Sequence, residues 1–138
     1  MKLENTTQYF TMLNSRQKIY IATLDKVLYP DVLVVFETPE HFEDSESLLI
    51  NPLLIVEVAS KTTRQYDRGE KFMLYRSLPS FREYVLIEQD STKVEVWFRS
   101  AENKWEINCE TRLENSIFLQ SICLNISLLD IYENIMDL

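Results

Sequence analysis

The amino-acid sequence predicts a fold of the α/β or α+β class, in which helices pack beside one central sheet. Three observations carry this prediction. The segments 52–59 (PLLIVEVA) and 83–88 (EYVLIE) are apolar runs of strand length, as in the interior of a sheet. The segment 93–99 (KVEVWFR) alternates polar and apolar residues, which is typical of a half-exposed strand. Residues 62–77, between the first two runs, are predicted to form a helix that follows a threonine cap and stops before Pro79.

The remaining elements follow from shorter signals. Thr62 or Thr63 can cap the central helix, and Ser127 can cap a closing helix over 127–136. The polar residues 1–17 are expected to contain the end of a helix, through Tyr9, Phe10 and Leu13. Further strands are predicted at 18–23, 30–36, 105–109 and 117–119.

Length and composition exclude several classes of protein. The 138 residues fit a single domain over 1–138, and one Gly and one His exclude glycine-rich phosphate loops and zinc sites built on several histidines. Cys109 and Cys123 lie in apolar segments and are interpreted as reduced core thiols. No apolar run is long enough for a membrane span or a signal peptide, so we expect a cytoplasmic protein with no membrane partner.

Charge is distributed unevenly along the chain. The 14 basic and 22 acidic residues give a formal net charge of −8, which provides no global attraction to nucleic acid. The segment 58–82 is nevertheless rich in Lys and Arg. It is either a basic patch that faces phosphate groups or a solvated helix face, and the sequence leaves both interpretations open.

Two acidic residues stand in or at the start of strands that the sequence predicts. Glu57 lies inside the apolar run 52–59, where an unpaired carboxylate costs several kcal/mol, and Asp31 opens the predicted strand 30–36. Two carboxylates on adjacent strands would suit Mg²⁺, which binds oxygen ligands. The alternatives are a strand edge or a salt bridge for Glu57 and an ordinary turn position for Asp31.

One face of the predicted central helix carries further candidates. Asp67, Lys71 and Tyr75 recur every four residues and therefore share a face. Apolar residues extend this face, which would set it against the sheet and bring Lys71 towards the strand of Glu57. The alternative is a surface pair between Asp67 and Lys71, with a contribution of about 0.3–0.5 kcal/mol.

Three segments together resemble a known family. The strings YPDVLVV, PLLIVEVASKTTRQYDRGEKFMLYRSLPSFREYVLIEQD and KVEVWFR are similar to the Uma-two-type family of restriction-endonuclease-like proteins, within the PD-(D/E)XK nuclease superfamily. The resemblance covers about residues 18–136. It implies a restriction-endonuclease-like mixed central sheet flanked by helices.

The resemblance implies roles for single residues. Asp31 matches the Asp of PD and Glu57 the acid of (D/E)XK, so both would be metal ligands, with the Val58 carbonyl as a third. The motif lysine would fall at Ala59, and a lysine on the following helix, which matches Lys71, is thought to replace it in this family. Three further residues match positions of the family and would support the site: Asp67, Tyr75 and Tyr84.

The chain departs from the family pattern at its amino terminus. Family members usually have further residues ahead of the segment that starts near Lys18, including a β-hairpin and a helix that often bears an acid near the metal. Residues 1–17 would be a remnant of this shortened region, and Glu4 is a poor match for the missing acid. An inactive chain therefore stays as an alternative.

The residue pattern and the resemblance together predict a Mg²⁺-dependent endonuclease, with Mn²⁺ as a second candidate ion, that hydrolyses DNA phosphodiester bonds. Asp31, Glu57 and Lys71 would be catalytic, whereas Arg64 and Arg68 would contact phosphate. The alternatives are an inactive nuclease fold that binds nucleic acid or protein, and an acidic protein-interaction domain. A homodimer is a further expectation, because two cuts need two sites and an incomplete sheet exposes its edges.

Overall fold

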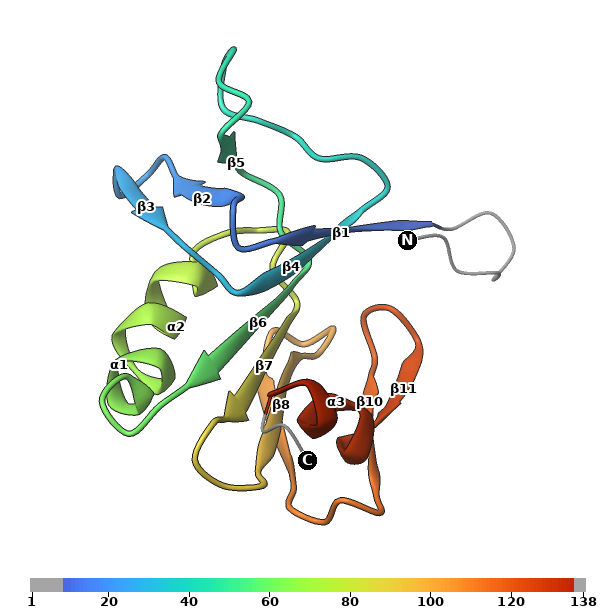
Figure 1. Ribbon diagram of the computed structural model, residues 1–138. Helices are drawn as coiled ribbons and strands as arrows, with labels where there is room; N and C mark the ends of the chain where they lie inside the picture. The colour runs from blue at the N-terminus through green and yellow to red at the C-terminus, as the bar shows by residue number, and fades with distance from the viewer. Residues whose placement is uncertain (1–8, 136–138) are drawn as a thin grey trace.

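The computed structural model describes residues 9–135, which are built around a six-stranded mixed sheet (Figure 1). Within it β6 and β7 are parallel, and the other neighbouring strands are antiparallel. The order across the sheet is β1 (Phe10–Asn14), β4 (Val32–Phe36), β6 (Leu54–Ala59), β7 (Glu83–Glu88), β8 (Val94–Arg99) and β9 (Trp105–Glu110).

Smaller elements surround this sheet. One small sheet contains β3 (Lys26–Leu28), β2 (Lys18–Ile21) and β5 (Leu48–Leu49), and a hairpin is formed by β10 (Ser116–Leu119) and β11 (Leu124–Ser127). The helices are α1 (Arg64–Arg68), α2 (Glu70–Arg76) and α3 (Leu128–Ile135). Together with the mixed sheet, these short helices place the fold in the α+β class.

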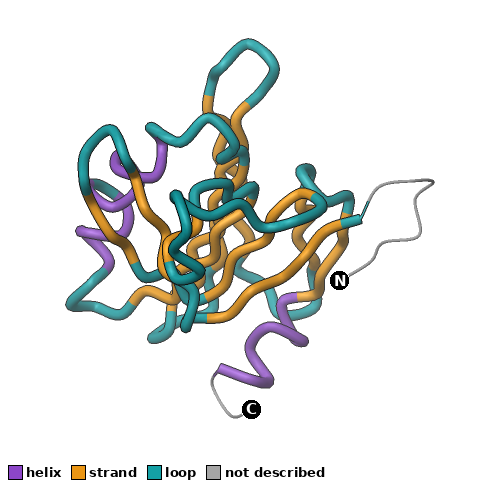
Figure 2. Tube along the Cα trace, turned by 90° about the horizontal axis from the view of Figure 1, so that it is seen from above, coloured by secondary structure: helices purple, strands orange, loops and turns teal. Residues whose placement is uncertain are grey.

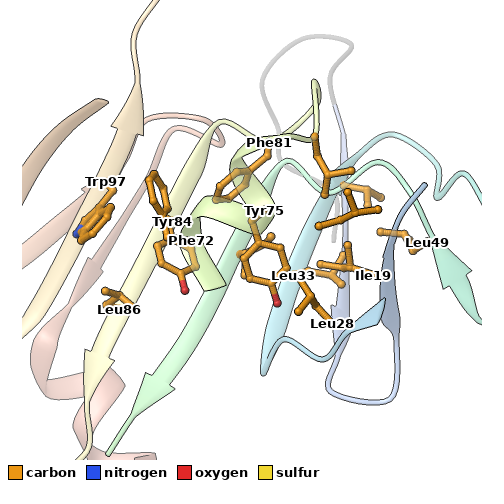
Figure 3. Close-up of a cluster of buried hydrophobic side chains, with 14 residues drawn as sticks. Ile19, Leu28, Leu33, Leu49, Phe72, Tyr75, Phe81, Tyr84, Leu86 and Trp97 are labelled. Atoms are coloured by element: carbon orange, nitrogen blue, oxygen red, sulfur yellow. The ribbon is translucent and has the colours of Figure 1, made fainter. Parts of the chain in front are cut away.

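The two faces of the main sheet are covered by different elements (Figures 1 and 2). On one face, Tyr84 of β7 packs with Phe72 and Tyr75 of α2 in an aromatic core (Figure 3). On the other face, Val85 of β7 belongs to a second core with Leu128 of α3 and the β10–β11 hairpin. Because side chains alternate along a strand, each central strand contributes to both cores.

Most predicted elements of the main sheet are present. The predicted strand 83–88 matches β7 residue for residue, and β4, β6 and β8 begin within two residues of their predicted starts. The predicted cap of α3 is confirmed, because the Ser127 hydroxyl accepts the N–H of Asp130 at 3.1 Å. Position 136, where this helix is predicted to end, lies outside the described residues.

The predicted helix end through Tyr9, Phe10 and Leu13 is wrong. Residues 10–14 form strand β1, which pairs antiparallel with β4 along its whole length. Phe10 and Leu13 have the spacing of one helical turn, yet in the strand they contact different cores. Pairing with β4, which lies far along the sequence, overrides this local signal. Residues 1–8 of the predicted amino-terminal remnant lie outside the described residues.

The predicted central helix is interrupted at Gly69. α1 ends at Arg68 and α2 begins at Glu70, with Gly69 at φ −107° and ψ −94°. A Cβ atom at this position would lie 3.1 Å from the carbonyl oxygen of Gln65, so the absence of a side chain permits this close approach. Thr63 occupies the predicted cap position, but no side-chain cap hydrogen bond forms there.

Both cysteines are exposed, which contradicts their interpretation as core thiols. Cys109 lies on β9, the last strand of the sheet, and Cys123 lies in the turn between β10 and β11. Apolar neighbours in the sequence misled here, because residues 106–109 of the outer strand β9 are all exposed and Cys123 lies in a turn. Between residues 9 and 135, no helix is long and apolar enough to cross a membrane.

Candidate active site

Asp31 and Glu57 lie across two neighbouring strands. Asp31 directly precedes β4, and Glu57 lies in β6. The antiparallel register pairs Val32 with Val56, so the next position along the ladder sets Asp31 opposite Glu57. Oδ2 of Asp31 also accepts the backbone N–H of Val58 at 2.7 Å. The negative charge of Asp31 is close enough to raise the pKa of Glu57.

The Glu57 carboxylate lies beneath the helices and is 3% exposed. The Lys71 ammonium is 2.8 Å from its Oε2 atom, and the Tyr75 hydroxyl donates to the same oxygen at 2.9 Å. Both hydrogen bonds that the described residues make to this carboxylate therefore fall on Oε2. The second oxygen, Oε1, is the atom left to bind a ligand.

The helical segment brings Asp67, Lys71 and Tyr75 to one face, as their spacing predicts. Besides Glu57, the Lys71 ammonium lies 4.0 Å from Oδ1 of Asp67 and donates to the carbonyl oxygen of Tyr29 at 3.3 Å. The Lys71 side chain is 12% exposed. Its charged end is thus held by groups from the helix, from β6 and from the residues before β4.

Burial and neighbouring charges act in opposite directions on these groups. Burial raises the pKa of Glu57 to about 7, although the Lys71 ammonium and the Tyr75 hydroxyl lower it. Burial also raises the pKa of Asp67, and Lys71 partly offsets this. The Tyr84 hydroxyl donates to the Asp67 carbonyl oxygen at 2.8 Å. Burial raises the pKa of Tyr75 and Tyr84, so both hydroxyls keep their protons.

Arg64 and Arg68, for which phosphate contacts are predicted, form ion pairs with the sheet. Nη2 of Arg64 lies 2.7 Å from Oε2 of Glu88 in β7, and Arg68 contacts Glu95 in β8. Both glutamates are buried, whereas each arginine side chain is 39% exposed. Contact of these arginines with phosphate stays a prediction. It would require each guanidinium group to bind its glutamate and a phosphate group at the same time.

Sequence reasoning missed Glu88 and Glu95 as partners of the helix cations. The alternation of side chains along a strand could have identified Glu88. Tyr84 and Leu86 of the same strand face the helices, and Glu88 is the next residue that points the same way. Each of three successive strands thus offers one acid to a base on α1 or α2. The pair of Glu57 and Lys71 differs from the other two because a second carboxylate, that of Asp31, lies beside it.

The donor atoms at this place fit a hard divalent cation. Asp31 and Glu57 would contribute carboxylate oxygens from adjacent strands, and Val58, whose N–H donates to Asp31, would contribute its backbone carbonyl. Mg²⁺ and Mn²⁺ prefer such oxygen ligands, which water molecules complete. The raised pKa of Glu57 indicates that Lys71 does not fully compensate the buried negative charge. In the described part of the chain, no group of three or more His, Cys, Asp and Glu side chains could hold a metal.

One solved structure is similar to the chain in its fold. It is the crystal structure of "a putative nuclease belonging to DUF820" from Anabaena variabilis. The two chains superpose with a TM-score of 0.69 over 90% of this chain and 68% of the other, at 17% sequence identity. A likeness at this identity establishes a shared fold.

Comparisons of sequence identify the family. Two uncharacterized proteins of Synechocystis, sll1609 and slr1290, are each 32% identical to the chain, over 105 and 125 residues that cover 76% and 88% of it. The chain spans 59% and 63% of the length of these relatives. The model of the Uma2 family, described as "Putative restriction endonuclease", matches residues 4–127. The chain therefore belongs to the Uma2 family.

Proposed function

We propose that this protein is a divalent-metal-dependent endonuclease that hydrolyses phosphodiester bonds in DNA. One observation carries the proposal: the Lys71 ammonium lies 2.8 Å from Glu57, and Asp31 lies opposite Glu57 on the next strand. Phosphodiester hydrolysis requires that negative charge be neutralised while a water is activated, and this set of groups suits both tasks. Membership of the Uma2 family supports the same class of reaction.

In this proposal Asp31, Glu57 and the Val58 carbonyl hold Mg²⁺ or Mn²⁺. When bound, the ion would neutralise charge on the scissile phosphate and lower the pKa of a water molecule. Tyr75 is a positioning residue, because its hydroxyl holds Oε2 of Glu57 at 2.9 Å. Asp31 is held in turn by the Val58 N–H, which fixes one of its oxygens beside β6.

Lys71 serves in place of the lysine of the (D/E)XK motif, whose position is occupied by Ala59. Its ammonium carries a proton at Nζ that can be donated to a phosphate oxygen, which stabilises the charge that develops in the transition state. Glu57, Asp67 and the Tyr29 carbonyl hold this ammonium before any substrate binds. Such positioning reduces the entropy lost on reaching the transition state.

The proposed substrate side of the site is the surface of α1. Arg64 and Arg68 lie there with half-exposed guanidinium groups, on a chain whose net charge is −8. Contacts to DNA would therefore be local and would use these arginines and the bound cation. Phosphate contacts of this kind position a duplex without reading its sequence.

An inactive nuclease fold that binds nucleic acid or protein is the second candidate. The observation that favours it is the ion pair itself, since the Lys71 ammonium compensates part of the charge of Glu57 without a cation. In an inactive protein this pair would be purely structural. The two candidates differ in whether a divalent cation binds beside the pair.

A plasmid-cleavage assay tests the proposal. Purified protein is incubated with supercoiled DNA in Mg²⁺, in Mn²⁺ and in EDTA, beside the variants Glu57→Ala and Lys71→Ala. Lys61→Ala, which changes an exposed lysine just before α1, is the matched control. We expect cleavage that requires the metal, disappears in both site variants and persists in the control. Binding without cleavage in all variants would support the inactive fold instead.

A further inference from the structure

Strand β9 forms an outer edge of the six-stranded sheet. All six of its residues pair with β8, with no bulge and no proline in its sequence WEINCE. Residues 106–109 are exposed, and the Ile107 side chain is 52% exposed. A regular, exposed edge of this kind is a template for a further strand.

The direction of each backbone group on β9 follows from the hairpin that precedes it. Ser100 N–H donates to the Lys104 carbonyl oxygen at 2.8 Å, which begins the ladder between β8 and β9. Hydrogen-bonded and non-hydrogen-bonded pairs alternate along an antiparallel ladder. Positions 106, 108 and 110 therefore bond to β8, and the N–H and C=O groups of Trp105, Ile107 and Cys109 point outward.

We propose that β9 pairs with β9 of a second copy of this chain, antiparallel and about a two-fold axis at Ile107. In this register the outward groups of positions 105, 107 and 109 bond one another, which forms about six hydrogen bonds between the chains. The exposed side chain of Ile107 meets its own copy. The joined sheet then runs without interruption from one molecule into the other.

Charge selects this register over its neighbours. An axis at Glu106 would set the two Glu106 side chains opposite each other, and an axis at Asn108 would set Glu106 opposite Glu110. An axis at Ile107 instead sets Glu106 opposite Asn108 and Glu110 opposite Lys104. The Lys104 side chain is 77% exposed, and its one ion pair among the described residues is with the equally exposed Glu102 at 3.6 Å. Its ammonium group can therefore reach a carboxylate of the second copy.

The opposite edge of the sheet, strand β1, has no comparable charges that would select one register of pairing. β1 (FTMLN) exposes the Met12 side chain but has no charged residue that would fix a register or an orientation. Charge complementarity therefore favours β9 as the surface for a second copy, and the net charge of −8 on each chain makes matched local charges necessary.

Such a dimer has a consequence that rests on the proposed function. Residues directly opposite in an antiparallel pair point to the same side, so both helix-covered faces would lie on one side of the joined sheet. Seven strand spacings separate the two β6 strands, which amounts to roughly 34 Å. This is close to one turn of B-DNA, so both sites could address one duplex.

A cysteine experiment tests the axis without any enzymatic readout. One variant has its single cysteine at position 107 (Ile107→Cys with Cys109→Ser and Cys123→Ser), and the other keeps only Cys109 (Cys123→Ser). At the axis the two Cα atoms would lie about 5.5 Å apart, within disulfide range. The two Cys109 residues would lie four residues apart along the strands. We expect oxidation to join the first variant into dimers and to leave the second monomeric on denaturing gels.

Equal cross-linking of both cysteine variants, or cross-linking of Cys109 alone, would overturn the register. Sedimentation equilibrium tests the pairing itself, with Asn108→Lys and Asn108→Glu, because position 108 faces Glu106 of the other copy. We expect the dimer dissociation constant to fall about tenfold with Lys and to rise about tenfold with Glu. The exposed Thr23 supplies matched charge controls, Thr23→Lys and Thr23→Glu, which should leave it unchanged. A wild-type protein that stays monomeric at high concentration would contradict the dimer, whatever its nuclease activity.

Discussion

Glu57 and Glu83 are buried carboxylates on neighbouring strands of one sheet, yet they face opposite sides of it. Glu83 in β7 is completely buried and accepts N–H bonds from Gln120 and Ser121 at 3.0 and 2.8 Å. The Ser121 hydroxyl donates to it at 2.6 Å, and these bonds involve both of its oxygens. Glu57 in β6 receives both of its donors on one oxygen, and one of these donors is the Lys71 ammonium.

The difference separates a structural carboxylate from a candidate catalytic one. The donors of Glu83 are two amides and a hydroxyl at the turn that links β10 to β11, so this carboxylate ties the hairpin to the sheet. Burial raises the pKa of both groups, but only Glu57 has a second carboxylate, Asp31, beside it. A buried acid with one unbound oxygen, a cation and a second acid nearby is suited to bind a metal.

The largest expected effect is on cleavage and distinguishes the two glutamates. We expect Glu57→Gln to reduce metal-dependent DNA cleavage by on the order of 10³-fold, because the isosteric amide removes a negatively charged ligand. Glu83→Gln should leave the cleavage rate of the folded protein within about twofold. Initial rates on supercoiled plasmid measure both. Equal losses in the two variants would mean that cleavage reports on folding alone.

The second effect is on stability, and here we expect the substitution of Glu83 to have a larger effect than that of Glu57. Glu83→Ala should lower the free energy of unfolding by about 3 kcal/mol, since it leaves a cavity at a fully buried side chain and removes the hydrogen-bond partner of two partly buried N–H groups. Urea unfolding followed by circular dichroism measures this change. Glu57→Ala should cost less, because Lys71 keeps Asp67 and the Tyr29 carbonyl as partners. A larger loss for Glu57→Ala than for Glu83→Ala would reverse the assignment of roles.

The third effect is the pH dependence of stability in EDTA. The pKa of Glu57 is about 7 in the folded protein and 4.5 ordinarily, so the folded state binds the extra proton between these values. The stabilisation that the extra proton on Glu57 provides is fully present below pH 4.5. It is lost as the pH rises through 7, which lowers the free energy of unfolding by up to about 3 kcal/mol. Glu57→Gln cannot titrate, so its stability relative to wild type should rise across this window. A difference that stays constant from pH 4.5 to 8 would contradict the raised pKa.

The smallest effect concerns the tyrosine beside Glu57. Tyr75→Phe removes a hydrogen bond to the ionised carboxylate, so the pKa of Glu57 should rise by roughly one unit or less. Tyr84→Phe is the matched control, because this equally buried hydroxyl bonds the Asp67 carbonyl. Carbon-13 NMR of the Glu57 carboxyl group measures both variants. Equal shifts in the two variants would show that Tyr75 has no specific role.

The sequence was most informative where a strand is buried on both faces. The prediction for β7 matches its bounds, because a continuous apolar run carries its own signal. Residues 10–14 misled, since the pairing of β1 with β4 decides their structure and no local pattern reports it. The break at Gly69 was also unpredicted, because it depends on a close approach to the Gln65 carbonyl.

The candidate site was predictable in its residue types and less so in its partners. Helical spacing left two interpretations of Lys71 open, contact with the strand of Glu57 or a surface pair with Asp67, and the structure shows the ammonium in contact with Glu57 and 4.0 Å from Asp67. The acids that hold Arg64 and Arg68, and the turn that holds Glu83, come from segments 24 to 38 residues away along the chain. Contacts over such separations are set by the packing of the whole fold, which no single segment encodes.

Calorimetric titration of Mn²⁺ into wild-type protein, Asp31→Asn, Glu57→Gln and Glu83→Gln tests the central claim most directly. If Asp31 and Glu57 together hold the cation, wild type and Glu83→Gln should each show one site with similar affinity. Asp31→Asn and Glu57→Gln should each show none. Absent binding in wild type, or equal binding in all four proteins, would contradict a metal site between β4 and β6.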